Sequence, residues 1–367
     1  MNNYISLETQ YFQLSFSMAL YMDDIGQMLK SLKNPKNLNQ GQGAAASAMT
    51  SATNKTTDLS IRDIETSSKV DDIFFVFRKV VSRSISSLCS PSICATINLT
   101  SSNFDSLYIP YIEILLKQTY GGDFDKKRDY FLVILNDMCT TNTYIAQMQR
   151  ELVDLTNQRL TTDDEVKMIT MCINGDSLTT LSDRMETLLK ENVEKIVQIL
   201  SIPINQLIFP INHIHYEIND QEYERYEIND PFAQDFLDSF DDLLSPYKSI
   251  LLTSIFDKLI NHLSSHVAAT LEDHIKQKKF NFLGALQLSK DIRKIIDHCV
   301  QLTSEQNIRH KFIRLQQIVQ LLTMDKVTDI QDYTQEGYQW KLSVLDIKLL
   351  LARRSDFPLQ AVHNLKL

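Results

Sequence analysis

The sequence predicts an all-α protein built from stacked bundles of antiparallel helices. Apolar residues recur at steps of three and four along most of the chain, as on one face of a helix, and alternation with a period of two is nowhere sustained. The 367 residues include only 8 glycines, fewer than folds rich in strand turns or phosphate-binding loops require. A chain of this length is too long for a single hydrophobic core, so two domains are expected.

The N-terminal region combines a helix with a polar insert. Residues 5–33 are expected to be helical, since apolar side chains such as Leu14 and Met18 recur at helical steps. Nothing in the sequence caps this helix or supplies its partner, so we interpret residues 1–33 as a helix from a truncated preceding region. Residues 34–68 are dominated by Asn, Gln, Ser, Thr, Ala and Gly, a composition that predicts a disordered low-complexity insert.

The next region, residues 69–244, is expected to form a helical bundle. Helical spacing recurs from Val70 onward and in four later segments, 92–118, 126–158, 164–173 and 176–201. Pro203 and Pro210 are expected to end regular helix.

A local duplication follows these helices. Tyr216-Glu217-Ile218-Asn219-Asp220 recurs as residues 226–230, and we interpret it as a repeat tolerated in a loop. Asp230 precedes Pro231, a pattern typical of a helix N-cap followed by proline at the first helical position. A helix is therefore expected to begin there.

Residues 245–367 are expected to form a second, smaller bundle. A long helix is predicted over 245–277, with Pro246 marking the domain boundary, and a break is predicted over 280–288. The predicted starts of the later helices are Ser289, Ser304 or Asn307, Asp325, Ser343 with Asp346 at the capping-box position, and Pro358.

Composition narrows the classes of function. Residues 248–367 hold 17 basic and 12 acidic side chains in a chain of net charge −9, a balance too small and scattered to indicate nucleic-acid binding. The five cysteines match no zinc spacing and no secreted disulfide scaffold. No phosphate-binding or dinucleotide-binding glycine motif occurs. The longest apolar runs are about five residues, whereas a membrane span needs about 20. We therefore expect a reduced cytosolic protein that can only lie against a membrane.

Catalytic and metal-binding patterns are weak. His262 and His266 lie four residues apart on one predicted helix face, a spacing at which two histidines can share a metal. No H-E-x-x-H motif accompanies them, and His213 and His215 form a similar isolated pair. A helical metal protein built on His262 and His266 stays open as an alternative. Otherwise no catalytic residue, metal site or cofactor is expected.

Five segments together resemble one family, in order and in spacing. The segments are Val70–Val76, Asn229–Gln234, Phe282–Leu288, Ile308–Leu315 and Val327–Ile330, supported by Cys94–Leu99 and by the C-terminal residues 349–367. The family that they resemble is subunit 4 of the conserved oligomeric Golgi complex, and the likeness covers nearly everything but the insert.

This resemblance implies a non-enzymatic subunit of a tethering complex in intra-Golgi retrograde transport. The implied fold is a rod of stacked helical bundles, as in multisubunit vesicle tethers. The implied place is the cytoplasmic face of the Golgi membrane, as a peripheral protein, and the implied partners are the other subunits of the complex. Membrane-fusion proteins are implied as partners of the N-terminal half. A rod-like subunit of another tether, such as the exocyst, is the alternative.

The chain departs from this family in three respects. Family members are about twice as long, and their N-terminal half is missing, so we expect this chain to be a fragment or to function without the rest. Phe232 stands where the family has a tryptophan, and the insert 34–68 is not a family feature.

Arg314 and Asp346 are predicted to form a structural ion pair. Arg314 lies on the flank of an apolar helix face, where a charge needs a partner. The helix after Ser343 is apolar nearly all round, so we expect it to be buried, and Asp346 is its only acid. The resemblance places an arginine and an acid at these positions. Three alternatives stay open: Asp346 only caps its helix, Asp346 pairs with Arg353, or Lys311 takes the place of Arg314.

Overall fold

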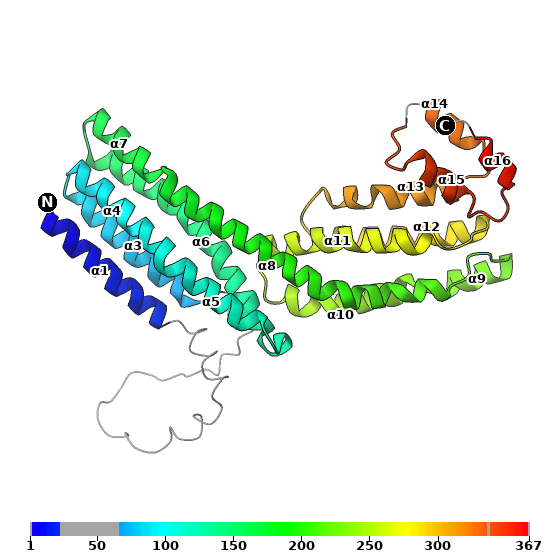
Figure 1. Cartoon of the computed structure of the whole chain (residues 1–367), viewed down its shortest axis with the longest axis horizontal. Helices are drawn as coiled ribbons and strands as arrows, with labels where there is room; N and C mark the ends of the chain where they lie inside the picture. Colours follow the sequence, from blue (N-terminus) through cyan, green and yellow to red (C-terminus); the bar gives the residue numbers. More distant parts are fainter. Residues whose placement is uncertain (1, 23–65, 336–337, 366–367) are drawn as a thin grey trace, which may run out of the picture. The chain divides into compact units, whose positions relative to one another are not determined.

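The computed structural model describes residues 2–22, 66–335 and 338–365, and these residues fold almost entirely into helices (Figure 1). Within these ranges extended backbone pairs only in two isolated bridges, from Tyr216 to Phe280 and from Phe280 to Arg354. The predicted all-α class is confirmed. The insert predicted to be disordered, 34–68, lies outside the described residues except for its last three positions.

Two compact units divide the chain. The first comprises Met1–Asn192 and Ser249–Leu252, and the second comprises Val193–Lys248 and Thr253–Leu367. The boundary falls inside one helix, Asp176–Ile208 (α8), and not near residue 245. The predicted division into a helical bundle over 69–244 and a smaller bundle over 245–367 stays a prediction.

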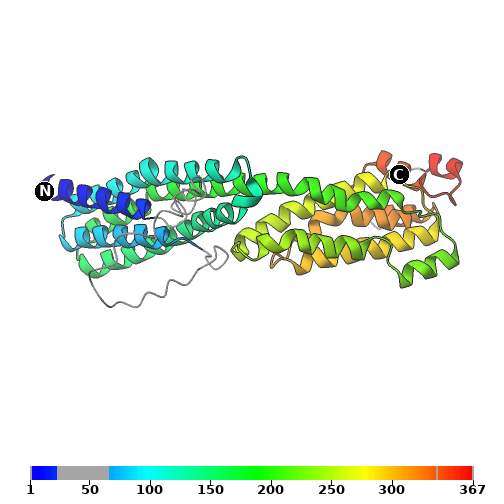
Figure 2. The ribbon, with the colours of Figure 1, turned by 90° about the horizontal axis from the view of Figure 1, so that it is seen from below.

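The first unit is a bundle of helices, which lie side by side in Figure 2. Its helices are Asn2–Tyr21 (α1), Ser68–Ser86 (α3), Ser90–Asn103 (α4), Ile109–Tyr120 (α5), Phe124–Arg159 (α6), Asp163–Ile173 (α7) and the first half of α8. Aromatic rings fill its core: Phe104 meets Phe16 at 5.2 Å, Phe74 at 5.4 Å and Phe77 at 5.7 Å between ring centroids. The predicted helix over 5–33 is confirmed as far as Tyr21.

A π-helical turn, Phe104–Tyr108, joins α4 to α5. Pro110 is the second residue of α5, and a proline can neither donate a backbone hydrogen bond nor fit against the carbonyl four residues earlier. A single π turn of this kind occurs mostly as a bulge within an α-helix.

A buried ion pair anchors the start of α3. The Lys69 ammonium lies 2.9 Å from the Asp137 carboxylate of α6, and both side chains are fully buried. The same carboxylate accepts hydrogen bonds from the Ser67 backbone N–H at 2.8 Å and from its hydroxyl at 2.7 Å. A buried carboxylate of this kind is stabilised only when it is paired and hydrogen-bonded.

Over its described residues, the second unit contains the rest of α8 and eight further α-helices. They are Asp220–Ile228 (α9), Ala233–Lys248 (α10), Thr253–Ile275 (α11), Phe282–Gln301 (α12), Ile313–Leu322 (α13), Asp329–Gln335 (α14), Val344–Leu351 (α15) and Leu359–His363 (α16). Short 3₁₀ turns, Phe209–His213 and Ile308–Phe312, precede the loop before α9 and the start of α13.

Two prolines with predicted roles lie inside helices: Pro203 was expected to end regular helix, and Pro246 was expected to mark the domain boundary. Pro203 lies within α8 and Pro246 within α10. Near Pro203 the side chains of Leu200, Ile204 and Ile208 are buried. Burying each such side chain stabilises by about 1.5–3 kcal/mol, which together exceeds the roughly 3 kcal/mol that an internal proline costs.

The single long helix predicted over 245–277 is wrong, because the chain breaks at residues 249–252. Asn136 of α6 holds this break: its amide N–H donates to the Ile250 carbonyl at 2.7 Å, and its oxygen accepts from the Leu252 N–H at 3.0 Å. The backbone groups released by the break are thus paired by one side chain.

The predicted break over 280–288 is also wrong, because α12 begins at Phe282 and Ser289 lies inside it. Asn281 is the N-cap, and its side-chain oxygen accepts from the Gly284 N–H at 2.9 Å. The same amide donates to the Ile218 carbonyl at 2.6 Å. A Cβ at Gly284 would lie 1.7 Å from the Tyr216 carbonyl oxygen, so glycine is required at this close approach.

The duplicated segment is not the loop that the sequence suggested. Residues 220–228 form α9, whose Asn219 and Glu222 make a reciprocal capping box. Asp230 does cap the following helix, since its carboxylate accepts from the Phe232 and Ala233 N–H groups at 2.9 and 2.6 Å. Both copies therefore lead into a helix.

Candidate functional site

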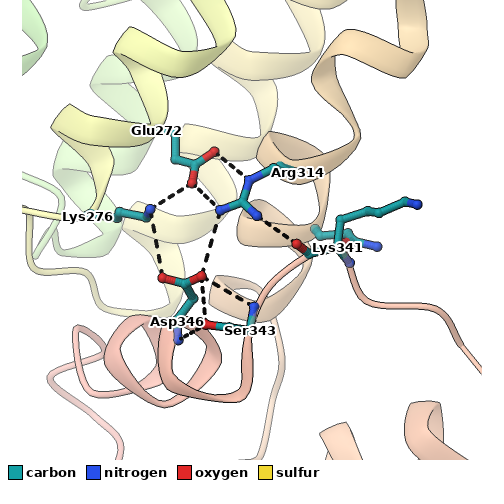
Figure 3. Close-up of polar contacts among 7 residues, drawn as sticks. Glu272, Lys276, Arg314, Lys341, Ser343 and Asp346 are labelled. Carbon is teal, nitrogen blue, oxygen red and sulfur yellow. Dashed lines mark hydrogen bonds and ion pairs between the residues drawn. The ribbon is translucent and has the colours of Figure 1, made fainter.

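The predicted pair lies in a cluster of charges that joins three helices of the second unit (Figure 3). Arg314 is in the first turn of α13, and Asp346 is in the first turn of α15. Arg314 Nη2 lies 3.8 Å from Asp346 Oδ2, at the long end of ion-pair distances. The structure thus brings the two residues together, but a closer acid competes for the arginine.

Glu272 of α11 is that nearer partner of Arg314. Arg314 Nε and Nη2 donate to the two Glu272 oxygens at 3.2 and 2.7 Å. This two-pronged geometry is the strongest form of arginine–carboxylate pairing. The remaining guanidinium nitrogen, Nη1, donates to the Lys341 carbonyl at 2.6 Å. Arg314 therefore ties α11 to the segment that leads into α15.

Lys276 completes a neutral set of two bases and two acids. Its ammonium lies 2.7 Å from Glu272, one turn away on α11, and 4.0 Å from Asp346. Burial by itself raises the pKa of Glu272, but the hydrogen bonds from Arg314 and Lys276 outweigh it and hold that pKa below its ordinary value. Each acid of the cluster thus faces both bases.

Asp346 also caps its own helix, which was part of one of the alternatives. Its backbone N–H donates to Ser343 Oγ at 3.1 Å, and the Ser343 hydroxyl donates to Asp346 Oδ2 at 2.9 Å. The hydrogen bond from the Ser343 hydroxyl is the largest cause of a lowered pKa at Asp346. Capping and ion pairing therefore coexist at this carboxylate.

The cluster lies at the protein surface, contrary to the expectation that the helix after Ser343 is buried. Leu345 is 69% exposed and Leu349 is 56% exposed, whereas Ile347 and Leu350 face inward. The side chain of Arg314 is 43% exposed, that of Asp346 28% and that of Glu272 only 12%. Glu272 is therefore the charge for which pairing matters most.

Sequence analysis missed two charged residues that hold this region together. Glu272 had a local signal, because Lys276 lies four residues later on the same helix face. Arg354 had none: its buried guanidinium donates to the Leu322 and Met324 carbonyls and pairs with Asp356 at 2.7 Å. It thereby satisfies carbonyls at the C-terminal end of α13.

The two histidines of the alternative metal protein, His262 and His266, are not joined by a shared partner in the described residues, and neighbouring helix positions bond amides. His266 Nε2 lies 2.9 Å from the Asn205 oxygen, and His274 Nδ1 lies 3.0 Å from the Asn212 oxygen. His262 is exposed. Over residues 2–22, 66–335 and 338–365, no group of three His, Cys, Asp or Glu side chains is placed to hold a metal ion. The alternative is not favoured.

The charge cluster has the chemistry of a structural tie. Its acids and bases neutralise one another, and one carboxylate is committed to a helix cap. What it fixes is the relative position of α11, α13 and α15 within the second unit. Among the described helices, none is both long and apolar enough to cross a bilayer.

Two consecutive family models match the chain. Residues 1–115 match the family described as "COG4 transport protein, middle alpha-helical bundle". Residues 131–348 match "Conserved oligomeric Golgi complex subunit 4, C-terminal". The second match alone covers more than half of the chain.

Curated relatives carry the same description. The chain is 27% identical to conserved oligomeric Golgi complex subunit 4 of Homo sapiens and of Drosophila melanogaster, over 82% of this chain in both cases. It is 25% identical to the Arabidopsis thaliana protein over 84% of this chain. The chain spans 43% of the length of the human relative.

Solved structures of similar fold include two helical domains. The C-terminal domain of the exocyst subunit Sec6p matches with a TM-score of 0.52 and 13% identity, covering 97% of this chain and 88% of that one. The Myo4p globular tail domain matches with a TM-score of 0.50 and 13% identity, covering 95% and 88%. These likenesses show the fold, whereas the sequence matches show the family: the chain belongs to the conserved oligomeric Golgi complex subunit 4 family.

Proposed function

We propose that this chain is a subunit of the Golgi vesicle-tethering complex and acts in intra-Golgi retrograde transport. The observation that carries the proposal is the match of two family models in order, over residues 1–115 and 131–348. The complex and the organelle are those for which the relatives are named.

The proposed mechanism is geometric and not catalytic. Helical bundles hold binding surfaces at set positions, and ties such as Arg314–Glu272 and Lys69–Asp137 keep the helices of each unit in register. The proposed partners are the other subunits of the complex. Membrane-fusion proteins are proposed as partners of the N-terminal half that the longer relatives have.

The proposed location is the cytoplasmic face of the Golgi membrane, where the chain is held as a peripheral protein by its partners. Fluorescently tagged chain in its own cells should overlap a Golgi marker and should leave washed membranes in alkaline carbonate. A matched variant, Gly284→Leu, should lose the overlap because the close approach to Tyr216 cannot accept a side chain. Wild-type chain on another organelle would contradict the proposal.

A further inference from the structure

Three side chains in the interior of the second unit each carry a buried polar atom without a hydrogen-bond partner of normal geometry among the described residues. The atoms are Tyr216 Oη, Gln287 Oε1 and Asp291 Oδ2, and the three residues are 2%, 2% and 0% exposed. Gln287 Nε2 donates to the other Asp291 oxygen, Oδ1, at 2.8 Å, and the Tyr216 hydroxyl interacts with the Asp291 carboxyl. Because buried polar atoms are normally paired, these three need a group that pairs them.

Asp291 lies among charges that do not neutralise it. None of the ion pairs between described residues includes Asp291, and the Lys294 ammonium on the same helix is already paired with Asp230. Burial, followed by the Asp230 carboxylate, raises the pKa of Asp291 to about 7. The side chains that oppose this rise are Gln287, Lys294 and Tyr216. An ionised Asp291 would thus be a buried charge without a base, which costs much free energy.

A count of donors and acceptors shows what the three side chains lack. With Asp291 ionised, the Gln287 amide and the Tyr216 hydroxyl donate to its two oxygens, and Gln287 Oε1 is left without a donor. A protonated Asp291 supplies one more donor. Asp291 Oδ2 then donates to Tyr216 Oη, and the Tyr216 hydroxyl donates to Gln287 Oε1. All three atoms have a partner in this arrangement, and no charge is buried.

We propose that Tyr216, Gln287 and Asp291 form a proton-binding site, in which a ring of three hydrogen bonds closes only when Asp291 carries a proton. The ring joins α12 to residues 214–218, the segment that leads into α9. The backbone of this segment also reaches the N-cap of α12, since the Tyr216 carbonyl accepts from the Asn281 N–H at 3.1 Å. The bound proton therefore holds the segment against α12, and its loss around neutral pH weakens that attachment.

Infrared difference spectroscopy of the full chain tests where the proton lies. At about pH 6, carboxyl groups with ordinary pKa values are almost fully ionised. The wild-type spectrum minus that of Asp291→Asn should therefore contain the carbonyl band of about one neutral carboxylic acid, and the band should vanish above about pH 8. The asparagine amide keeps a donor in place of the proton, so circular dichroism should show this variant folded. Absence of the band at about pH 6 from folded wild-type chain overturns the proposal.

Two matched variants test the hydrogen bond to Tyr216. Tyr216 and Tyr226 hold the same position in the two copies of the duplicated segment, but only Tyr216 is buried. Tyr216→Phe should keep the band of the neutral carboxyl and move it to higher frequency, because the carboxyl loses its acceptor. Tyr226→Phe should leave the band in place, although Tyr226 of α9 also interacts with Tyr216. A band that Tyr216→Phe does not move overturns the ring.

Hydrogen exchange tests whether the proton holds the segment, and it needs no change at Tyr216. The Ile218 N–H donates to Asn281 Oδ1 at 3.3 Å, so its protection reports whether the segment stays on α12. Corrected for the intrinsic exchange rate, this protection should fall about tenfold between about pH 6 and 8 in the wild-type chain, as expected for the loss of one proton. It should not fall in Asp291→Asn. An equal fall in both chains overturns the attachment by the proton.

Discussion

Arg314 should be coupled energetically to Glu272 and much less to Asp346. The Glu272 pair is two-pronged, with its shorter distance at 2.7 Å, and the acid is 12% exposed. Its coupling should lie between those of exposed and buried pairs, at about 1–2 kcal/mol. The Asp346 contact is 3.8 Å long and more exposed, so its coupling should stay under about 0.5 kcal/mol.

The chain provides its own probe for this measurement. Its single tryptophan is Trp340, next to the Lys341 carbonyl that Arg314 binds, and its ring lies 4.8 Å from that of Tyr338. Tryptophan fluorescence in urea therefore follows unfolding at this corner of the second unit. Arg314→Met, Glu272→Gln and Asp346→Asn, alone and in pairs, give two double-mutant cycles. Asp346→Asn removes the charge but keeps an oxygen that can cap the helix.

An exposed pair supplies the matched control. Arg309 and Asp297 lie 2.9 Å apart, with side chains 56% and 45% exposed, so their coupling should be under about 0.5 kcal/mol and should vanish in high salt. The reasoning is refuted if Arg314 couples more strongly to Asp346 than to Glu272. It is also refuted if the Arg314–Glu272 coupling equals that of the exposed control.

Three further perturbations follow from single contacts. Gly284→Ala should cost more than about 3 kcal/mol in urea melts, because its Cβ would lie 1.7 Å from a backbone oxygen, whereas Gly121→Ala, with its nearest contact at 3.5 Å, should cost under about 1 kcal/mol. Lys69→Ala should cost roughly 3–5 kcal/mol by leaving Asp137 buried and unpaired, and replacing both residues by apolar ones should recover much of that loss. Burial raises the pKa of Asp291 from 3.8 to about 7, so the folded chain binds a proton more tightly and its stability should fall as pH rises from about 4 to 7, by up to about 4 kcal/mol. Asp291→Asn should reduce this dependence of stability on pH in urea melts carried out at several pH values. An unchanged dependence would contradict the raised pKa of Asp291.

Local patterns in the sequence predicted the helices well where packing agreed with them. Helix α6 was expected over 126–158 and runs over Phe124–Arg159, and α7 was expected over 164–173 and runs over Asp163–Ile173. The Ser343 capping box was expected and is present. In these segments the apolar period, the caps and the tertiary contacts all favour the same structure.

The errors occur where distant residues decide the local structure. The break at 249–252 depends on Asn136, which lies more than a hundred residues earlier in the chain. Pro203 is tolerated because tertiary burial outweighs its local cost. Neither effect has a signal within a helical window of the sequence.

The candidate site could be predicted only in part, because one of its two ion pairs again depends on distant residues. A charge on the flank of an apolar face indicated that Arg314 needs a partner, and Asp346 does lie within ion-pair distance. The preference for Glu272 depends on how α11 packs against α13, a long-range arrangement that spacing along the chain does not encode.

The central claim, membership of a Golgi tether, is tested most directly by purifying the chain from its own cells and identifying its partners by quantitative mass spectrometry. We predict that the other subunits of the conserved oligomeric Golgi complex co-purify in near-equal amounts. The Gly284→Leu variant serves as the misfolded control and should lose them. Recovery of exocyst subunits in their place, or of a partner-free chain carrying stoichiometric zinc, would contradict the account.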